Sequence, residues 1–340
     1  MISPAISLSI VIPVFNEEAG LPNLFRELTR VRDELLQSHG PVEIILVDDG
    51  SKDKSWGLIS AQCARDSGYV GVKLSRNFGH QLALTAGLES ARGEAVVSMD
   101  ADLQDPPEVI VQLLAAHRQG YDVVYATRAD RGTETLGKRV TALLFYRLIE
   151  KVSGVPILRN TGDFRLLSRR ALTELARLRE THRFLRGLVP WIGFPQTQVF
   201  YDRGDRTAGR THYPFHKMLL LAFDGIASMT TAPLRLAYAV SLALFAIFVG
   251  YIFYVLYDHF IRGSELVPGW TSIMAAITIF GTIQLLLLGV FGEYLGRIYE
   301  QSKRRPLYIV EEVKRAESAA KDSASPRTAN SDQHSVALPS

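Results

Sequence analysis

Short apolar runs alternate with amphipathic stretches along the first part of the chain. Each run is short and rich in β-branched residues, which predicts a buried strand. The stretch Glu17–Leu36 has its apolar residues at helical spacing, and Asn16 is placed to cap its start. The predicted strands are Leu8–Pro13, Val42–Val47, Val70–Leu74, Ala95–Met99 and Val123–Ala126, and further helices are predicted over Gln81–Ala91 and from Pro106 onward.

This alternation of strands and helices predicts an α/β fold with a mostly parallel sheet. Ligands of such sheets bind beyond the carboxyl ends of the strands. Four polar clusters fall at those predicted ends, which indicates one binding site rather than four ordinary loops. The clusters are Pro13–Glu17, Asp48–Asp49, Arg76–Asn77 and Asp100–Asp102.

Asp100 and Asp102 are the first candidates for chemistry. If the strand at Ala95–Met99 continues through them, their side chains share one face. Two carboxylates, completed by water or substrate phosphate, suit Mg²⁺ or Mn²⁺. Asp-X-Asp also occurs in surface turns, so the place of this pair after an apolar strand and before a predicted helix is what favours a metal site.

The remaining motifs narrow the ligand to a nucleotide diphosphate. The chain has no Gly-x-x-x-x-Gly-Lys-Ser/Thr, which argues against a P-loop enzyme. No Gly-x-Gly-x-x-Gly follows the first strand, which argues against a dinucleotide oxidoreductase. A metal-bridged nucleotide diphosphate remains, with Asp48 or Asp49 accepting hydrogen bonds from the base or ribose.

Net charge and cysteine content argue against a nucleic-acid-binding protein and against an intramolecular disulfide. The chain has 340 residues and a formal net charge of +3, so nothing indicates a nucleic-acid partner. The single cysteine, Cys63, has no second cysteine in the chain for a disulfide, as is usual in a reducing compartment.

Two long stretches without charged residues, Leu236–Tyr257 and Leu266–Gly292, are long enough to cross a bilayer. Basic residues flank them on the outer sides, whereas the intervening loop has Arg262 alone. The positive-inside rule then places both termini in the cytoplasm and predicts a multi-pass protein of the inner membrane. The amino terminus shows no signal-peptide pattern.

The chain divides by composition. We expect a nucleotide-binding core over 1–136, an acceptor or catalytic region over 137–235, two spans over 236–292, a juxtamembrane segment over 293–313 and a disordered tail over 314–340. Within the second region, Lys138–Val152 and Phe215–Met229 are apolar helices with basic residues. They suit the membrane interface better than a second set of core helices, which is the alternative.

Five ordered motifs resemble family 2 inverting glycosyltransferases with the GT-A fold. Within that family the chain is most similar to polyprenyl-phosphate glycosyltransferases, in particular bactoprenol glucosyltransferases of O-antigen modification, and more distantly to dolichol-phosphate mannose synthases. The resemblance extends from about Leu8 to Val313. Its motifs are Ile12–Glu18, Val47–Ser51, Ser75–Gly79, Asp100–Glu108 and Asn160–Leu166.

The resemblance implies roles for named residues. Pro13, Glu17 and Asp49 would line the nucleoside pocket. Asp100 would bind the nucleotide and, with Asp102, the metal. Gln104 would be a third metal ligand, and extended spacing would place it on their face. Asp105 also fits a helix N-cap followed by proline, and we expect that structural role for it.

Asp163 takes the place of the family's presumed catalytic carboxylate. A phosphate monoester has a second pKa of about 6, so the acceptor is already largely ionised. Three roles for Asp163 therefore remain open. It could act as a general base, orient a hydroxyl of the donor sugar, or help to position the metal. For the acceptor phosphate the candidates are Arg128, Arg131 and Arg139.

Two further residues belong to a loop that closes on the donor diphosphate in relatives. Arg206 is the stronger candidate. His212 stands where many relatives have lysine, and histidine is only fractionally charged near pH 7, which weakens its contact with the diphosphate.

The resemblance implies transfer of one sugar from a nucleotide diphosphate sugar to undecaprenyl or another polyprenyl phosphate at the cytoplasmic face of the bilayer. UDP-glucose is the first choice of donor; GDP-mannose, a UDP-N-acetylhexosamine and a UDP-aminopentose are alternatives. Small residues at Gly292 and Gly296 also allow a homo-oligomer.

Three competing functions are less well supported by the sequence. A flippase needs a polar pathway, whereas Leu266–Gly292 contains Gln284 as its one strongly polar side chain. A processive polysaccharide synthase would carry Gln-x-x-Arg-Trp, which is absent. A non-catalytic nucleotide-sugar sensor would bind the donor without turnover.

Overall fold

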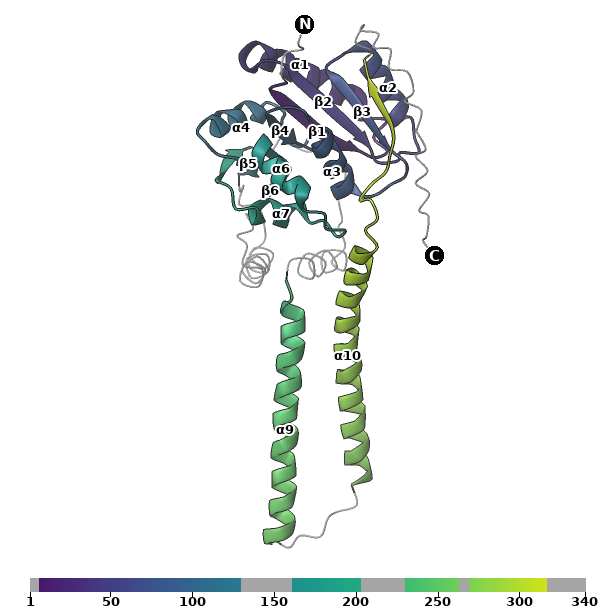
Figure 1. Ribbon diagram of the computed structural model, residues 1–340, viewed down its shortest axis with the longest axis vertical. Coiled ribbons are helices and arrows are strands. Elements are labelled where there is room, and N and C mark those ends of the chain that lie inside the picture. Colours follow the sequence, from purple (N-terminus) through teal and green to yellow (C-terminus); the bar gives the residue numbers. More distant parts are fainter. Residues whose placement is uncertain (1–5, 130–160, 203–229, 263–268, 317–340) are drawn as a thin grey trace, which may run out of the picture.

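The computed structural model describes residues 6–129, 161–202, 230–262 and 269–316. Helices pack on both faces of one sheet, and two long helices extend from its lower side (Figure 1). The elements are β1 (Leu8–Val14), α1 (Leu21–His39), β2 (Val42–Asp48), α2 (Ser55–Arg65), β3 (Tyr69–Leu74), α3 (His80–Ser90), β4 (Ala95–Ser98), α4 (Val109–Arg118), β5 (Val123–Arg128), β6 (Thr161–Ser168), α6 (Arg169–Arg177), α7 (Leu185–Trp191), β7 (Gln196–Tyr201), α9 (Ala232–Arg262), α10 (Trp270–Ser302) and β8 (Val310–Arg315).

The sheet confirms the predicted α/β class. Its eight strands run in the order β7-β5-β6-β4-β1-β2-β3-β8. The pairs β1–β2, β1–β4, β2–β3 and β5–β7 are parallel. β6 is antiparallel to both β4 and β5, and β8 is antiparallel to β3. Because β6 runs in reverse, its first residues lie at the same edge as the carboxyl ends of the parallel strands.

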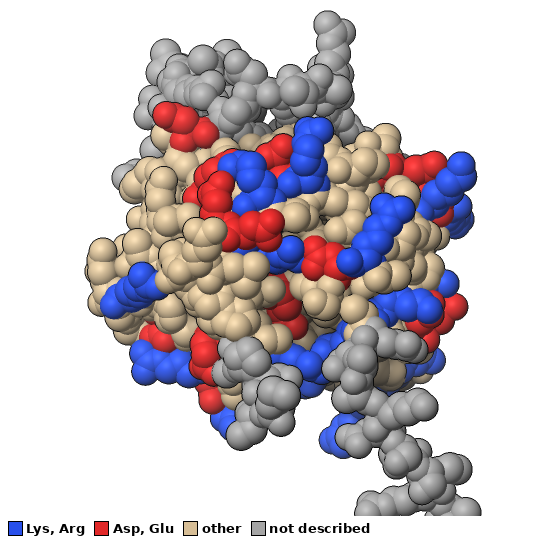
Figure 2. Space-filling view, turned by 90° about the horizontal axis from the view of Figure 1, so that it is seen from above, with Lys and Arg blue, Asp and Glu red and all other residues tan. Residues whose placement is uncertain are grey.

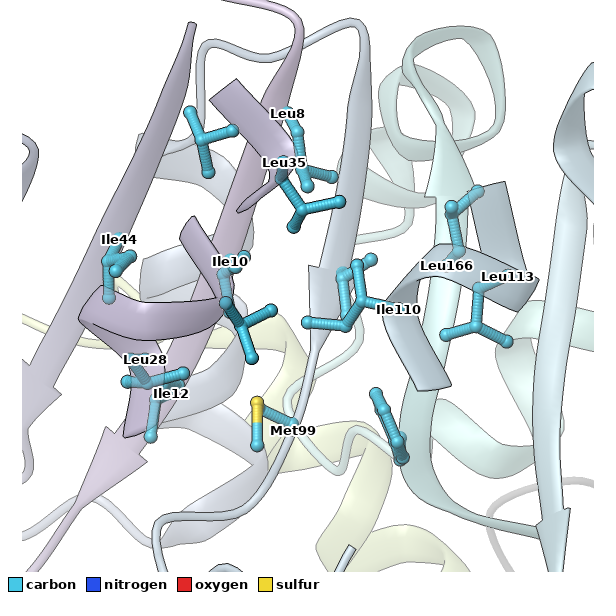
Figure 3. Close-up of a cluster of buried hydrophobic side chains, with 14 of the residues drawn as sticks. Leu8, Ile10, Ile12, Leu28, Leu35, Ile44, Met99, Ile110, Leu113 and Leu166 are labelled. Atoms are coloured by element: carbon cyan, nitrogen blue, oxygen red, sulfur yellow. The ribbon is translucent and has the colours of Figure 1, made fainter. Parts of the chain in front are cut away.

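Both faces of the sheet are covered, which explains why the strands read as continuous apolar runs. On one face the side chains of β1 pack against α1 and α4, and Figure 3 shows Ile10 and Ile12 beside Leu28 and Leu35. On the other face Val11 packs with residues of α3 and α6. On the described face turned away from the long helices, acidic and basic side chains are interspersed (Figure 2).

The predicted start of the first helix is wrong. α1 begins at Leu21, and Asn16 does not cap it, because Pro22 belongs in the first turn of a helix, where no amide hydrogen bond is lost. Asn16 has φ of 54°. Its backbone N–H donates to Ser51 Oγ at 2.9 Å, and its side-chain oxygen accepts from the Lys52 N–H at 2.8 Å. Asn16 therefore ties together the loops that follow β1 and β2.

Two predictions about the segment after β4 are also wrong. The strand ends at Ser98, so Asp100 and Asp102 lie in a turn and not on an extended strand. The Asp102 carboxylate accepts from the Gln104 N–H at 3.1 Å, and Leu103 has φ of 52°. Strand alternation therefore does not place Gln104. α4 begins at Val109 with Glu108 before it, so Asp105 is not its N-cap.

The end of the described chain returns to the sheet. β8 runs to Arg315 and forms the outer strand beside β3 (Figure 1). Lys314 and Arg315, which were expected to belong to a disordered tail, are therefore part of a strand. Hydrophobic periodicity does not reveal β8, because five of its six residues are exposed and three of those five are charged.

A membrane association is supported by one helix. Among the described residues, Ala276–Ser302 is the stretch long and apolar enough to cross a bilayer, with mean hydropathy 1.7 over its most apolar window. It overlaps the second predicted span. The first predicted span lies within α9, whose apolar part Ala237–Tyr251 is shorter. The predicted interface helices and the residues 317–340 lie outside the described residues.

A substitution at Gly87 can test how closely α3 packs against the sheet. A Cβ at this position would lie 2.8 Å from Val47 Cγ2 and closer still to Val11, so Gly87→Ala should lower the free energy of unfolding by about 1–3 kcal/mol. Gly57 in α2 is the matched control, because a Cβ there meets nothing within 4 Å. Gly57→Ala should raise the free energy of unfolding by roughly 0.5–1 kcal/mol. Urea unfolding of both variants measures this, and equal effects would contradict the close approach.

Candidate active site

A group of charged side chains gathers at the edge where β1, β2 and β4 end and β6 begins. Asp163 comes from the start of β6, and its side-chain partners come from α3, from α7 and from β6 itself. The Ser98 hydroxyl at the end of β4 donates to the Asp163 carbonyl at 2.5 Å, which fixes β6 against β4. The loops at neighbouring strand ends also contact one another, because Asn16 bonds to Ser51 and Asp49 bonds to the backbone after Asn77.

Asp163 is buried, with 4% of its surface exposed. Arg165, two residues along the same strand, donates to its Oδ1 at 2.7 Å and is itself buried. Arg186 of α7 donates through Nε and one terminal nitrogen, each at 3.3 Å. His80 Nε2 lies 3.2 Å from Oδ2, and the Gln81 side-chain amide donates to the same oxygen at 3.3 Å.

These neighbours decide the charge of Asp163. Burial alone would raise its pKa, because a carboxylate is less stable away from water. The hydrogen bond with His80 and the positive charges of Arg165 and Arg186 outweigh burial and hold the pKa well below its usual range. A carboxylate of such low basicity is a poor general base near neutral pH. The geometry favours a role in which Asp163 orients other groups.

Asp49 holds the loop that delivers His80. Its two carboxylate oxygens accept backbone hydrogen bonds from Phe78 at 2.7 Å and Gly79 at 3.0 Å. Gly79 has φ of 96°, a conformation that favours glycine, and α3 starts at the next residue. Asp49 thus has a structural role, and its contact with the nucleoside stays a prediction. Pro13 is buried within β1, and its contact with the nucleoside also stays a prediction.

A second, acidic cluster lies beside the first. Burial raises the pKa of Glu17, and the negative charges of Asp102 and Asp53 add to that rise. Burial also raises the pKa of Asp100. The nearby His80, whose Nε2 lies 3.6 Å from an Asp100 oxygen, opposes that rise, while Asp163 and Asp102 contribute to it. Asp102 is therefore close enough to repel both Glu17 and Asp100.

Such a cluster suits a divalent cation, which would relieve the repulsion. Among the described residues no group of three acidic, histidine or cysteine side chains is placed to hold a metal by itself. Mg²⁺ is commonly held by one or two carboxylates together with substrate phosphates, and the Asp100–Asp102 pair matches that pattern. Gln104, half-buried in the same turn, stays a predicted third ligand.

Asp105 and Arg128 pair with each other. Asp105 is buried, and its Oδ1 lies 3.2 Å from an Arg128 terminal nitrogen. The Tyr201 hydroxyl donates to the same carboxylate at 2.5 Å. Asp105 is thus structural, as expected, but through a link between β5 and β7 rather than through helix capping. The predicted binding of acceptor phosphate by Arg128 stays a prediction.

Four predicted residues lie outside the described parts of the chain: Arg131, Arg139, Arg206 and His212. Four residues that the sequence analysis did not select belong to the site: His80, Gln81, Arg165 and Arg186. Two of these had a signal in the sequence. His80 closes the run that begins Arg76–Asn77, and Arg165 shares a strand face with Asp163 by its spacing of two. Arg186 had no such signal, because it belongs to α7, which is distant in sequence from the other residues of the site.

The ion pair of Asp163 predicts how stability depends on pH. Asp163→Asn leaves Arg165 as a buried charge without its carboxylate, which should cost about 3–5 kcal/mol at pH 7. Because the folded pKa lies below the unfolded value of about 3.9, the wild-type advantage is present above that pH and is lost as the pH falls below it.

Thermal unfolding at pH 7 and at about pH 3.5 measures that difference. Glu174→Gln, which breaks the exposed pair with Arg177, is the control and should change stability by no more than about 0.5 kcal/mol. A deficit of Asp163→Asn that stays constant below pH 4 would contradict the depressed pKa.

The chain is similar to known glycosyltransferases. Residues 9–176 match the family model for glycosyl transferase family 2. The uncharacterized glycosyltransferase YkcC of Bacillus subtilis is 44% identical over 90% of this chain and 94% of its own. The prophage bactoprenol glucosyl transferase homolog of Escherichia coli is 40% identical over 91% of this chain and 99% of its own.

A solved structure shows a more distant likeness. Glucosyl-3-phosphoglycerate synthase of Mycobacterium tuberculosis is 21% identical, with a TM-score of 0.43 over 65% of this chain and 78% of its own. The relatives in sequence, in contrast, match along almost their whole length. The chain therefore belongs to glycosyl transferase family 2 and is a glycosyltransferase.

Proposed function

We propose that this glycosyltransferase transfers one sugar onto undecaprenyl phosphate or another polyprenyl phosphate. The preferred donor in this proposal is UDP-glucose. The observation that supports this most strongly is the extent of the likeness to the E. coli bactoprenol glucosyl transferase homolog. That identity of 40% spans 308 residues and so includes the apolar helices as well as the α/β domain. A protein that keeps both parts is suited to a water-soluble donor and a lipid acceptor.

The acceptor explains why the site has no strong base at Asp163. A phosphate monoester with a second pKa of about 6 is mostly a dianion near neutral pH, so it attacks the sugar without losing a proton. One displacement at the anomeric carbon then inverts its configuration. In this proposal Asp163 remains ionised throughout and holds Arg186 and His80 at the reacting groups.

The donor diphosphate is held at the acidic cluster. We propose that Asp100 and Asp102, with Gln104 as a third ligand, bind Mg²⁺ or Mn²⁺ together with the two phosphates, while Pro13, Glu17 and Asp49 line the nucleoside pocket. When bound, the cation supplies positive charge that stabilises the departing nucleoside diphosphate. Arg206 and His212 are proposed to contact the same diphosphate.

One of the two arginines that pair with Asp163 is suited to bind the acceptor phosphate. Arg186 is about half exposed, in contrast to buried Arg165, and Asp163 fixes the direction of its guanidinium. A planar guanidinium binds phosphate through paired hydrogen bonds. We therefore add Arg186 to Arg128, Arg131 and Arg139 as a candidate for the acceptor phosphate.

The membrane arrangement follows from the sequence pattern. We propose that α9 and α10 form a hairpin that crosses the inner membrane twice, with the catalytic domain and both termini in the cytoplasm. The basic residues Lys303, Arg304 and Arg305 directly follow α10, which supports that orientation.

The reaction is tested with purified full-length protein in detergent, UDP-glucose, Mg²⁺ and undecaprenyl phosphate, with lipid-linked glucose as the expected product. Asp102→Asn should lower kcat by at least about a hundredfold, because the leaving group loses its charge stabilisation. Glu34→Gln, an exposed residue of α1, is the control and should leave the rate unchanged. Full activity of Asp102→Asn would contradict the metal assignment, and a panel of other nucleotide sugars identifies the donor.

Arg186 is tested by its effect on the acceptor. Arg186→Ala should raise KM for undecaprenyl phosphate by about ten- to a hundredfold, the range expected for a charge-assisted phosphate contact. The KM for UDP-glucose should change little, and Arg186→Lys should recover part of the loss. Arg177→Ala, which removes an exposed arginine of α6, is the matched control. An equal rise in both KM values would assign Arg186 a general structural role.

A further inference from the structure

Gln301, in the last turn of α10, contacts the catalytic domain with both ends of its side-chain amide. Its oxygen accepts from the Thr181 backbone N–H at 2.8 Å and from the Thr181 hydroxyl at 2.9 Å. Its nitrogen donates to the Arg179 carbonyl at 2.9 Å. One side chain of a long apolar helix thus makes three hydrogen bonds to a segment 120 residues earlier in the sequence.

A second contact set lies just beyond the helix. Glu89, in the last turn of α3, accepts from the Tyr308 hydroxyl at 2.7 Å and from Arg179 at 2.9 Å. Ile309 then accepts from the Ser75 N–H at 3.0 Å, and β8 follows as the outer strand of the sheet. Figure 1 shows α10 leading directly into this edge of the domain. The domain is therefore joined to α10 by side chains as well as by the chain itself.

Both contact sets lead to the candidate active site. Thr181 precedes Arg186 by five residues, and the intervening segment is held by Arg183, which donates to the Leu178 and Leu175 carbonyls. Glu89 belongs to α3, whose first two residues are His80 and Gln81. The Gln81 side-chain oxygen in turn accepts from the Leu185 N–H at 3.2 Å, at the start of α7.

We propose that Gln301 is a positioning residue, which fixes the active site at a set height and orientation relative to the membrane. An α-helix is rigid along its axis and rises about 1.5 Å per residue, so the position of Gln301 at the end of the stretch Ala276–Ser302 determines its depth relative to the bilayer. Through Thr181, that distance sets the place of α7 and of Arg186.

This inference rests on the proposed function, because a set height matters only for an acceptor that is itself embedded. The phosphate of undecaprenyl phosphate stays near the bilayer surface, whereas geranyl phosphate reaches the site from water. Loss of the Gln301 contacts therefore affects the first acceptor and spares the second. A residue that merely supports the fold would affect both.

The test uses full-length protein in proteoliposomes, with UDP-glucose, Mg²⁺ and each acceptor in turn. Gln301→Ala should raise KM for undecaprenyl phosphate by about tenfold, because Arg186 is no longer held at the depth of the embedded phosphate. Its KM for geranyl phosphate and for UDP-glucose should stay within about twofold of wild type. Thr181→Ala, which removes one of the three hydrogen bonds, should give a smaller rise of the same kind.

Ser302→Ala is the matched control, because that hydroxyl donates to Tyr299 within α10. It should leave both KM values unchanged. Equal effects of Gln301→Ala on the two acceptors, or no effect on either, would overturn the proposal.

Hydrogen exchange of residues 178–186 gives a readout that does not depend on the reaction. The Thr181 amide should exchange faster in Gln301→Ala than in Ser302→Ala, and equal exchange would overturn the positioning role even if sugar transfer is observed. If wild type transfers sugar to neither acceptor, the proposed function fails, while the exchange result still decides the contact.

Discussion

The buried ion pair between Asp163 and Arg165 is the interaction on which the rest of the site depends. Two charges removed from water are stable only when their remaining hydrogen-bonding groups are satisfied. Asp163 meets this condition by gathering His80, Gln81 and Arg186, which come from two separate helices. The reversed strand β6 is what brings Asp163 to the edge where the parallel strands end. Asp163 thus joins the first residues of α3 and α7 at the site, while apolar packing holds both helices in the core.

His80 lies between two carboxylates whose surroundings differ. Its Nε2 is 3.2 Å from an oxygen of Asp163 and 3.6 Å from an oxygen of Asp100. Arg165 and Arg186 pair with Asp163, whereas Asp102 adds negative charge near both Asp100 and Glu17. These surroundings lower the pKa of Asp163 and raise that of Asp100.

The catalytic domain and the apolar helices form one connected body. The chain leaves the domain, passes through α9 and α10, and then returns to complete the sheet with β8. Because β8 pairs with β3, α10 is held at its carboxyl end by a strand and by the Gln301 contacts. The sheet is therefore complete only when the segment after the long helices is in place.

The sequence by itself determined the α/β class, the presence of five strands between Leu8 and Ala126, and the meeting of polar residues at the strand ends. These features follow from local periodicity and from where parallel strands end. It did not determine β8, whose exposed residues lack periodicity, or the turn at Asp100–Gln104, where hydrogen bonds within the turn replaced strand alternation. Arg186 and Gln301 were also beyond it. Their roles depend on contacts between segments far apart in the chain, and only tertiary packing decides which distant segments meet.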